Sequence, residues 1–406
     1  MIVALAPPIA ARADTPAPLA VPVITEAELL ARLDADPRLE RVAAAVDRAA
    51  ADVIAAGVAP NPSVSLEREA VFPDGGGLAT SYLRLTLPLE LSGRRAARRA
   101  AARAEVAAVT AEGEGARFAL AMHALGVLRA ATYERARVEL LRGERAALAS
   151  AVEIVRKRTS LGTASGYDLQ RIELELAAYD DLIAAAQTQL GAARLELGAL
   201  AGTPDGADAA EPLTVPPEPP PLALLLGDAL DQRAETRAAA ARTASADALA
   251  RSASRGWIPD LALTAGYVRQ DVSTDAAASG YTAALALSLP IFDRGQDERA
   301  RALAQRRAAA AERQVLARTV PALLRVRHQA LVDHLARSRA LARDRLARLD
   351  QLLRSAEAAY REGGGNVIEL VDAYATARDT RLRDLELRRD ARLAELELWI
   401  ALGRRP

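Results

Sequence analysis

Two carboxylates near the C-terminal end of the chain have the type and spacing to act on cations. Glu369 and Asp372 lie three residues apart in the segment 360–373, which reads YREGGGNVIELVDA. If a helix follows the glycines, both side chains lie on one face of its first turn. Carboxylates grouped around a narrow opening favour cations and can bind divalent metals. The pair is therefore a candidate for ion selection rather than for catalysis.

Each carboxylate also has a purely structural interpretation. Asn366 can cap the new helix, and Glu369 is then its reciprocal partner, an arrangement that stabilises a helix by about 1 kcal/mol. The two roles are compatible, because the cap uses only one oxygen of Glu369. Asp372 has only the helix dipole to explain it. Asp372 is thus the more specific indication of a functional carboxylate.

The turn before these carboxylates occurs twice. Gly363 ends one helix, because glycine enters the left-handed backbone region at low cost, and Asn366 begins the next. The segment 161–169, LGTASGYDL, has the same order of helix-ending glycine, capping serine and acid. One offset of about two hundred residues relates Gly162 to Gly363, Ser165 to Asn366, Asp168 to Glu369 and Leu169 to Leu370. A tandem duplication with two hairpin tips is predicted.

Composition narrows the class of protein. The chain has 406 residues, of which 51% are hydrophobic and 26% charged, and its formal net charge is zero. Balanced charge favours long, solvated helices and gives no reason to expect nucleic acid as a partner. Aromatic residues make up only 3%, so burial is expected at helix–helix seams, including seams between subunits. Since cysteine is absent, disulfides, thiolate metal sites and cysteine nucleophiles are excluded.

Nothing in the sequence indicates an enzyme. The three histidines, His123, His328 and His334, lie in predicted helices without the spacing of metal ligands. No Ser/His/Asp arrangement or phosphate-binding loop is recognisable. The sequence therefore predicts no catalytic activity, no cofactor and no metal site formed by this chain.

Residues 1–13 have features of the end of a secretory signal. Met1 to Ala11 is apolar, and Ala11-Arg12-Ala13 fits a cleavage site of small residues, although the usual basic start is missing. A remnant signal peptide is expected, with an apolar tail as the alternative. No later run of about twenty apolar residues is found, so no transmembrane helix is expected.

The first predicted repeat covers residues 14–202. Its elements are an extended leader (14–25), a helix (26–57) broken near Pro37, strands at 63–72 and 80–91 in a hairpin over 63–91, a long helix (94–159), the tip (161–169) and a returning helix that ends at Gly202. At about 1.5 Å per residue, the long helix approaches 100 Å. Its apolar residues near the tip alternate in steps of four and three, which predicts a coiled-coil seam with the returning helix.

A proline-rich linker at 203–222 separates this repeat from the second, which covers 223–406. The second repeat has a helix (223–255), a strand hairpin over 260–291 with strands at 260–270 and 280–291, a long helix (296–361), the tip (361–369) and a final helix (367–402). The predicted fold class is therefore mostly α with a small β part, in a duplicated unit of strand hairpin and long helices.

The strands alternate between a leucine-rich face and a small or polar face. Strands of about ten alternating residues suit a membrane barrel, which must close to satisfy its backbone hydrogen bonds. Four strands cannot close around a bore, whereas three chains would give twelve strands. Aromatic residues lie at or near the hairpin ends, as in interfacial girdles: Phe72, Tyr82, Trp257, Tyr267, Tyr281 and Phe292. Soluble hairpins that cap a helical bundle are the alternative.

The order of these segments resembles that of the TolC-like outer-membrane efflux protein family, over essentially the whole chain after residue 25. The matching segments are PNPSVSLE (60–67), LPLELSGRR (87–95), GTASGYDL (162–169), LPIFDRGQ (289–296) and YREGGGNVIELVDA (360–373). The first two are most similar to the heavy-metal branch, the outer-membrane partners of cobalt–zinc–cadmium or copper–silver exporters.

This resemblance implies a homotrimer in the bacterial outer membrane, with a twelve-stranded β-barrel continued by a twelve-helix α-barrel in the periplasm. The implied function is the exit duct of a tripartite efflux pump. The implied partners are outer-membrane lipid, a periplasmic adaptor protein and an inner-membrane pump of the resistance-nodulation-division type. Alternatives are the outer-membrane duct of type I protein secretion and a soluble periplasmic coiled-coil scaffold.

The resemblance also assigns roles at the tips. It implies that Glu369 and Asp372 form the constricting acidic rings and that Tyr360 and Asp168 make closing contacts between neighbouring helices. The remaining residues of the two turns are implied as latch and adaptor contacts: Gly162, Ser165, Leu169, Gly363, Asn366 and Leu370. One position departs from the family pattern, because Gly365 stands where a latch arginine is found. How the closed tip is held is therefore left open.

Overall fold

The computed structural model describes residues 21–72, 77–272 and 277–404, so the predicted signal peptide at 1–13 lies outside the described residues. The described chain divides into two compact units. Residues 21–35, 120–219 and 329–397 form what we call the tip unit. Residues 36–119, 220–328 and 398–404 form what we call the sheet unit.

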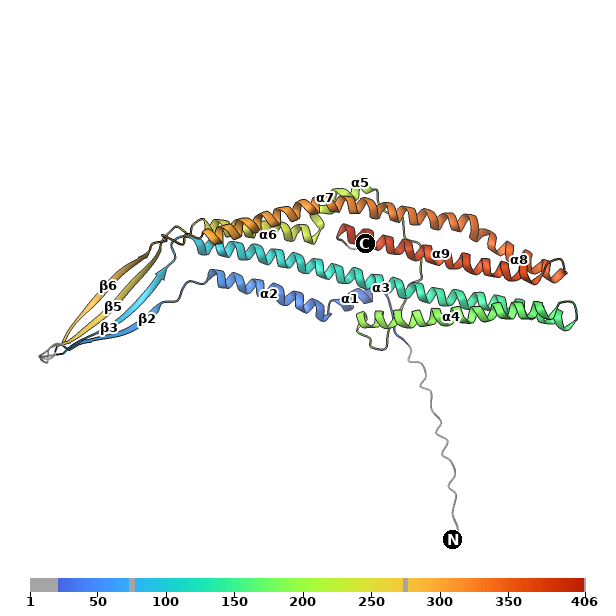
Figure 1. Ribbon diagram of the computed structural model, residues 1–406, viewed down its shortest axis with the longest axis horizontal. Coiled ribbons are helices and arrows are strands. Elements are labelled where there is room, and N and C mark those ends of the chain that lie inside the picture. The colour runs from blue at the N-terminus through green and yellow to red at the C-terminus, as the bar shows by residue number, and fades with distance from the viewer. Residues whose placement is uncertain (1–20, 73–76, 273–276, 405–406) are drawn as a thin grey trace, which may run out of the picture. The chain divides into compact units, whose positions relative to one another are not determined.

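Helices account for most of the described residues (Figure 1). The α-helices are α1 (Glu26–Leu33), α2 (Pro37–Gly57), α3 (Arg94–Ser160), α4 (Gly166–Ala201), α5 (Leu222–Gln232), α6 (Ala234–Ala253), α7 (Gln296–Leu341), α8 (Ala347–Glu362) and α9 (Val367–Leu402). A π-helical segment, η1 (Ala342–Leu346), joins α7 to α8. Within these described helices, no segment is both long and apolar enough to cross a membrane.

One four-stranded sheet belongs to the sheet unit (Figure 1). Its strands β2 (Ser63–Val71), β3 (Leu78–Leu89), β5 (Asp260–Val272) and β6 (Ala277–Ser288) pair antiparallel in the order β2-β3-β5-β6. The predicted strands are therefore present, with ends shifted by at most three residues. β6 stops at Ser288, just before Leu289-Pro290, because proline has no N–H to continue the ladder.

The register gives this sheet two unlike faces. Leu66, Leu83, Tyr267 and Tyr281 lie opposite one another across the four strands, as do Leu87, Leu263 and Leu285 in a second row. The side chains of this apolar face are largely exposed, with Leu66 at 79% and Leu285 at 66%. An apolar face that meets solvent across a whole sheet indicates a surface that contacts lipid or another apolar partner.

The opposite face of the sheet is polar. Arg84 on β3 forms an ion pair with Glu67 on β2. The hydroxyl oxygens of Thr86 and Thr264 lie 3.0 Å apart in a cross-strand hydrogen bond. The alternation that was predicted from the sequence therefore separates an apolar face from a polar face in the folded sheet.

A second, two-stranded sheet was not predicted. β1 (Val23–Ile24), in the expected leader, pairs parallel with β4 (Asp208–Ala209), in the expected linker. Both strands belong to the tip unit, and Ile24 is fully buried. Strands of two residues carry no periodic signal, so only the tertiary contact defines them.

Local capping explains the first helices. Thr25 forms a reciprocal capping box with Glu28, which begins α1, and Asp36 caps α2 with Pro37 in its first turn. The break expected near Pro37 is therefore confirmed. Gly202 ends α4 with φ 71°, in the left-handed region that glycine adopts most readily.

Two predicted helices differ from the structure. The helix expected over 223–255 is interrupted at Arg233, whose backbone is extended and whose guanidinium donates to the carbonyl oxygen of Ala401 at 2.6 Å. The helix expected over 296–361 contains η1, a π-helical turn that α-helical periodicity does not reveal. In the first case the contact that fixes the break lies far away in the sequence.

Candidate functional site

The first hairpin tip lies between α3 and α4. Gly162 has φ 73°, which reverses the chain after α3. The side-chain oxygen of Ser165 accepts from the backbone N–H of Asp168 at 3.1 Å, and Asp168 accepts from the N–H of Ser165 at 3.2 Å. This reciprocal box begins α4 as the sequence predicts. The Asp168 carboxylate is therefore already hydrogen-bonded to Ser165 of the same turn.

The second tip lies between α8 and α9. Gly363 has φ 83°, and the N–H groups of Gly364 and Gly365 both donate to the carbonyl of Ala359, at 2.9 and 3.0 Å. Asn366 accepts from the backbone N–H of Glu369 at 2.8 Å, which confirms the cap. In a full capping box, Glu369 would accept from the backbone N–H of Asn366. Here Glu369 instead accepts from the side-chain amide of Asn366 at 3.1 Å.

A shared apolar cluster supports both tips in the tip unit. Its buried members come from all four tip helices and include Val155 of α3, Ile172 of α4, Tyr360 of α8, and Leu370 and Val371 of α9. Leu169 is packed against its edge. Leu370 is therefore an internal support of the tip and not a surface contact. The resemblance had implied a latch or adaptor contact for this residue.

The first turns of α9 separate buried and charged residues. Val367, Leu370 and Val371 face the cluster and are at most 3% exposed. Glu369 and Asp372 are exposed on the other face, as their three-residue spacing requires. Among the described residues, the Asp372 carboxylate has no hydrogen bond or ion pair with protein, and the Glu369 carboxylate bonds only to the Asn366 side chain. Two carboxylates are thus available to solvent beside the tip.

An arginine that sequence reasoning missed connects the two tips. Arg158, in the last turn of α3, donates to the main-chain carbonyl of Tyr360 and to that of Thr163, the latter at 3.2 Å. Its guanidinium also lies 4.8 Å from the centre of the Tyr360 ring, a cation–π distance. Arg158 thus contacts its own turn and the last turn of α8 at the same time.

The resemblance implies closing contacts by Tyr360 and Asp168 between neighbouring helices, but within the described part of the chain the Tyr360 hydroxyl does not bond to Asp168. The Tyr360 hydroxyl is buried and has no hydrogen-bond partner in the described part of the chain. Burial raises the pKa of Tyr360, and the nearby Asp168 carboxylate adds to that shift. The ring, rather than the hydroxyl, makes the polar contact at the tips, through Arg158.

At Gly365 the turn leaves little room for a side chain. A Cβ atom there would lie 3.2 Å from the Cβ of Ala359 and 3.3 Å from a carboxylate oxygen of Glu369. These approaches are tighter than ordinary van der Waals contact. The narrow turn therefore favours glycine, and the arginine that contacts this tip is Arg158 of α3.

Farther along α9, a polar network connects it to the other three tip helices. Arg381 forms ion pairs with the buried Glu144 of α3 and with Asp350 of α8. Arg378 pairs with Glu175 of α4 at 3.1 Å and lies over the Tyr179 ring. These contacts fix the helix that carries the two exposed carboxylates.

Two tyrosines extend this network. The hydroxyl of Tyr374 donates to Glu357 of α8 at 2.6 Å, and that of Tyr179 donates to the Tyr374 carbonyl at 3.3 Å. Burial raises the pKa of Tyr179 to about 12. Burial also raises the pKa of Tyr374, with a further contribution from Glu357. Both hydroxyls therefore act as neutral donors near neutral pH.

Across the residues that the structure describes, no group of three or more His, Asp or Glu side chains is arranged to hold a metal ion. The tip carboxylates instead form a pair in each chain, open to solvent. Such a pair attracts cations by charge, and several copies around one axis would act together.

Comparison with known proteins gives consistent results. Residues 31–203 and 225–404 match the sequence model of a family described as outer membrane efflux protein. The chain is 27% identical over 375 residues to the cobalt-zinc-cadmium resistance protein CzcC of Cupriavidus metallidurans, covering 91% of this chain and 87% of that protein.

Solved structures share the fold. The outer membrane protein VceC of Vibrio cholerae superposes with a TM-score of 0.76 at 20% identity, over 93% of this chain and 96% of VceC. CusC, whose structures concern folding and transmembrane channel formation, gives a TM-score of 0.72 at 19% identity, over 94% of this chain and 92% of CusC.

Proposed function

Because this chain belongs to the outer membrane efflux protein family, we propose that three copies of it close around one central duct. The chain is an outer-membrane channel that extends into the periplasm and serves as the exit duct of a tripartite efflux pump. Transport through such a duct is passive, and the inner-membrane partner supplies the energy. Membership in this family argues against the alternative that the chain is a soluble periplasmic coiled-coil scaffold.

The four-stranded sheet carries the proposal of a trimer. Its outer strands, β2 and β6, each have one unpaired edge among the described residues. In lipid, unpaired backbone groups are too costly, so each edge must meet an edge of another chain. Three copies of this sheet would give a twelve-stranded barrel with its apolar face toward lipid and its polar face toward the lumen. Twelve helices would then form the periplasmic α-barrel.

The detergent-corrected mass of the protein extracted from cell envelopes tests this assembly. We expect a particle of about three chain masses that leaves the membrane only with detergent, because an exposed apolar face requires lipid or detergent to cover it. A monomer or dimer that is soluble without detergent would overturn the trimeric barrel.

We propose the tips as the constriction and docking end of the duct. Glu369 and Asp372 would form acidic rings, and Arg158 with the Tyr360 ring would hold the two hairpins of each chain together. Leu161, Tyr167 and Ile368 are 68%, 61% and 55% exposed at the tips, which makes them available to a periplasmic adaptor. Gly162, Ser165, Asp168, Gly363 and Asn366 would shape that surface, since they form the two turns.

We propose divalent transition-metal cations as the cargo and an inner-membrane pump of the resistance-nodulation-division type as the partner. The name of the 27% identical relative, a cobalt-zinc-cadmium resistance protein, supports this cargo. Exposed carboxylates at the proposed constriction are compatible with it. Disrupting the gene for this chain should lower tolerance to cobalt, zinc and cadmium salts and leave tolerance to organic antibiotics unchanged. The reverse pattern would overturn the proposed cargo.

A further inference from the structure

The connections between the sheet and the long helices carry an unusual excess of positive charge. We define the basic junction as residues 90–103, 251–260 and 291–301, all within the sheet unit. These three segments contain ten arginines and five carboxylates, so the junction carries a net charge of +5. The whole chain has a net charge of zero. Positive charge is therefore concentrated at this level of the fold.

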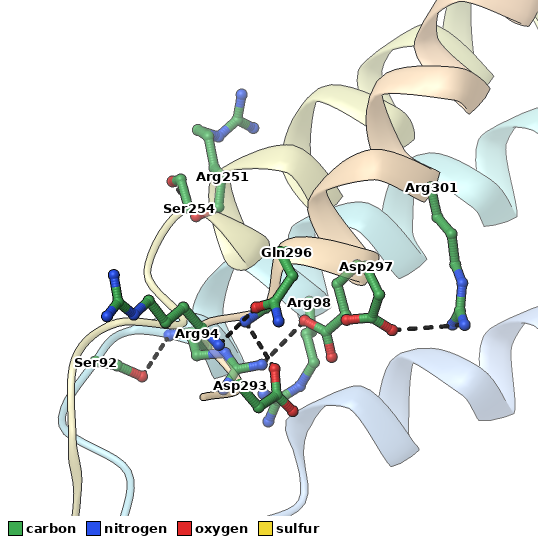
Figure 2. A network of polar contacts seen from close by, with 12 residues as sticks. Ser92, Arg94, Arg98, Arg251, Ser254, Asp293, Gln296, Asp297 and Arg301 are labelled. Carbon is green, nitrogen blue, oxygen red and sulfur yellow. Dashed lines mark hydrogen bonds and ion pairs between the residues drawn. The ribbon is translucent and has the colours of Figure 1, made fainter. Parts of the chain in front are cut away.

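About half of these arginines have a protein partner. Arg94 pairs with Glu298 at 3.0 Å and Arg98 with Glu90 at 2.7 Å. Arg301 pairs with Asp297 at 3.5 Å (Figure 2). Two more arginines donate to main-chain carbonyls, Arg255 to Gly93 and Arg294 to Ile291. The other five arginines are exposed, and their guanidinium groups form no hydrogen bond or ion pair with the described residues: Arg95, Arg99, Arg103, Arg251 and Arg299.

The position of these arginines is unfavourable for the protein alone. α3 begins with Arg94 and Arg95 and has no acidic residue in its first turn. Cations at a helix N-terminus oppose the helix dipole, and like charges four residues apart, as in Arg95 and Arg99, repel each other. An external anion would offset both effects. The helix dipole and the guanidinium groups would then both attract this anion.

The junction is held in place by close backbone contacts. The left-handed Gly93 and Gly295 end the two connections with φ 69° and 74°. A Cβ on Gly256 would lie 2.5 Å from the carbonyl oxygen of Arg294, so the turn after α6 packs directly on the turn before α7. The exposed arginines are therefore attached to a closely packed base.

Exposed apolar side chains lie at the same level. Trp257 is 65% exposed, Phe292 90%, Ile291 59% and Leu91 70%. Leu91, Ile291 and Phe292 follow strands β3 and β6, and Trp257 precedes β5. Each of the four lies within three residues of an arginine in the sequence. Large aromatic side chains next to arginines are typical of the boundary between acyl chains and lipid headgroups.

We propose that the basic junction binds the phosphate groups of anionic phospholipids in the leaflet on the helix side of the membrane. This inference rests on the proposed function, in which the apolar sheet face meets lipid. Arginine suits the task because its planar guanidinium donates two hydrogen bonds to one phosphate. Trp257 and Phe292 then contact the acyl chains beside the bound headgroup.

Trp257 supplies a direct readout of the lipid next to the junction. The chain has two tryptophans, so a Trp399→Phe background leaves Trp257 as the only one. The purified protein is reconstituted in vesicles that contain brominated phosphatidylglycerol or, at the same mole fraction, brominated phosphatidylcholine. Quenching of Trp257 should show enrichment of phosphatidylglycerol by about tenfold. The variant Arg95→Gln/Arg99→Gln/Arg251→Gln/Arg299→Gln should reduce this preference to within about twofold.

A matched variant removes the same charge elsewhere on the chain. Arg313, Arg318, Arg325 and Arg348 are also exposed and lack partners among the described residues. Their replacement by Gln should leave the preference unchanged. Suppose that the protein is a trimer in detergent. Equal quenching of Trp257 by both lipids, or an equal loss of the phosphatidylglycerol preference in both variants, would then overturn the junction site. If the protein is no trimer in detergent, the proposed function itself fails.

Discussion

Replacing Arg158 by Gln is expected to open the duct, with at least a threefold rise in conductance of the channel reconstituted in planar bilayers. Arg158 donates to main-chain carbonyls of two different turns and lies over the Tyr360 ring. Charge-assisted hydrogen bonds contribute about 1.5–3 kcal/mol each when they are shielded from water. Because Arg158 is only half-buried, we expect its replacement to destabilise the closed tip by about 2 kcal/mol per chain. That energy corresponds to about a thirtyfold shift in an open-to-closed ratio.

Matched variants separate this contact from general effects of charge. Arg156 lies two residues away, is exposed and pairs only with Glu153 and Glu173, at the first hairpin. Arg156→Gln should therefore leave conductance unchanged. Tyr360→Phe should also be neutral, because the Tyr360 hydroxyl has no partner among the described residues. An increase with Tyr360→Phe and none with Arg158→Gln would assign the latch to the hydroxyl instead.

The sequence predicts the tips well because their determinants are local. Gly162 and Gly363 require left-handed backbone, and Ser165 and Asn366 bond to residues three positions away. Such features depend on a few neighbouring residues and can be read directly from spacing. The same holds for the alternation that gives the sheet its apolar and polar faces.

The features that were missed depend on distant residues. Arg233 interrupts a helix because it contacts Ala401, and Ile24 forms a strand because Ala209 lies beside it. Arg158 has an ordinary interpretation as a cation near a helix C-terminus, which conceals its contact with Tyr360. The repeat did contain a signal, because Arg158 corresponds to Ala359 in the second copy. A charge in one copy against alanine in the other marks an asymmetric role.

The exposed face of α9 was predictable for the same local reason. Spacing alone placed Glu369 and Asp372 on one face, and burial of Val367, Leu370 and Val371 accounts for the other. Whether this face lines a constriction depends on how several chains assemble, which one sequence does not encode in any local pattern. The assignment of the acidic rings is therefore tested by function.

The double variant Glu369→Gln/Asp372→Asn is expected to lower the preference of the channel for cations over anions by about tenfold. In a trimer six carboxylates would surround one opening and create a potential of several kT, which concentrates cations there. Reversal potentials in a salt gradient measure this preference. Block by added cobalt ions should weaken in parallel, because the carboxylates that would bind the divalent ion are gone.

Two features of the chain make this test specific. Glutamine at position 369 keeps an oxygen that can accept from the Asn366 amide, so the cap and the fold are retained. Asp181 and Glu196 on α4 are exposed carboxylates without partners among the described residues, so Asp181→Asn/Glu196→Gln removes the same charge away from the tip. That control should keep its cation preference. A carboxylate ring at the constriction selects ions through its charge, so neutralising it must change selectivity. Unchanged selectivity in the tip variant would therefore show that Glu369 and Asp372 do not line the constriction.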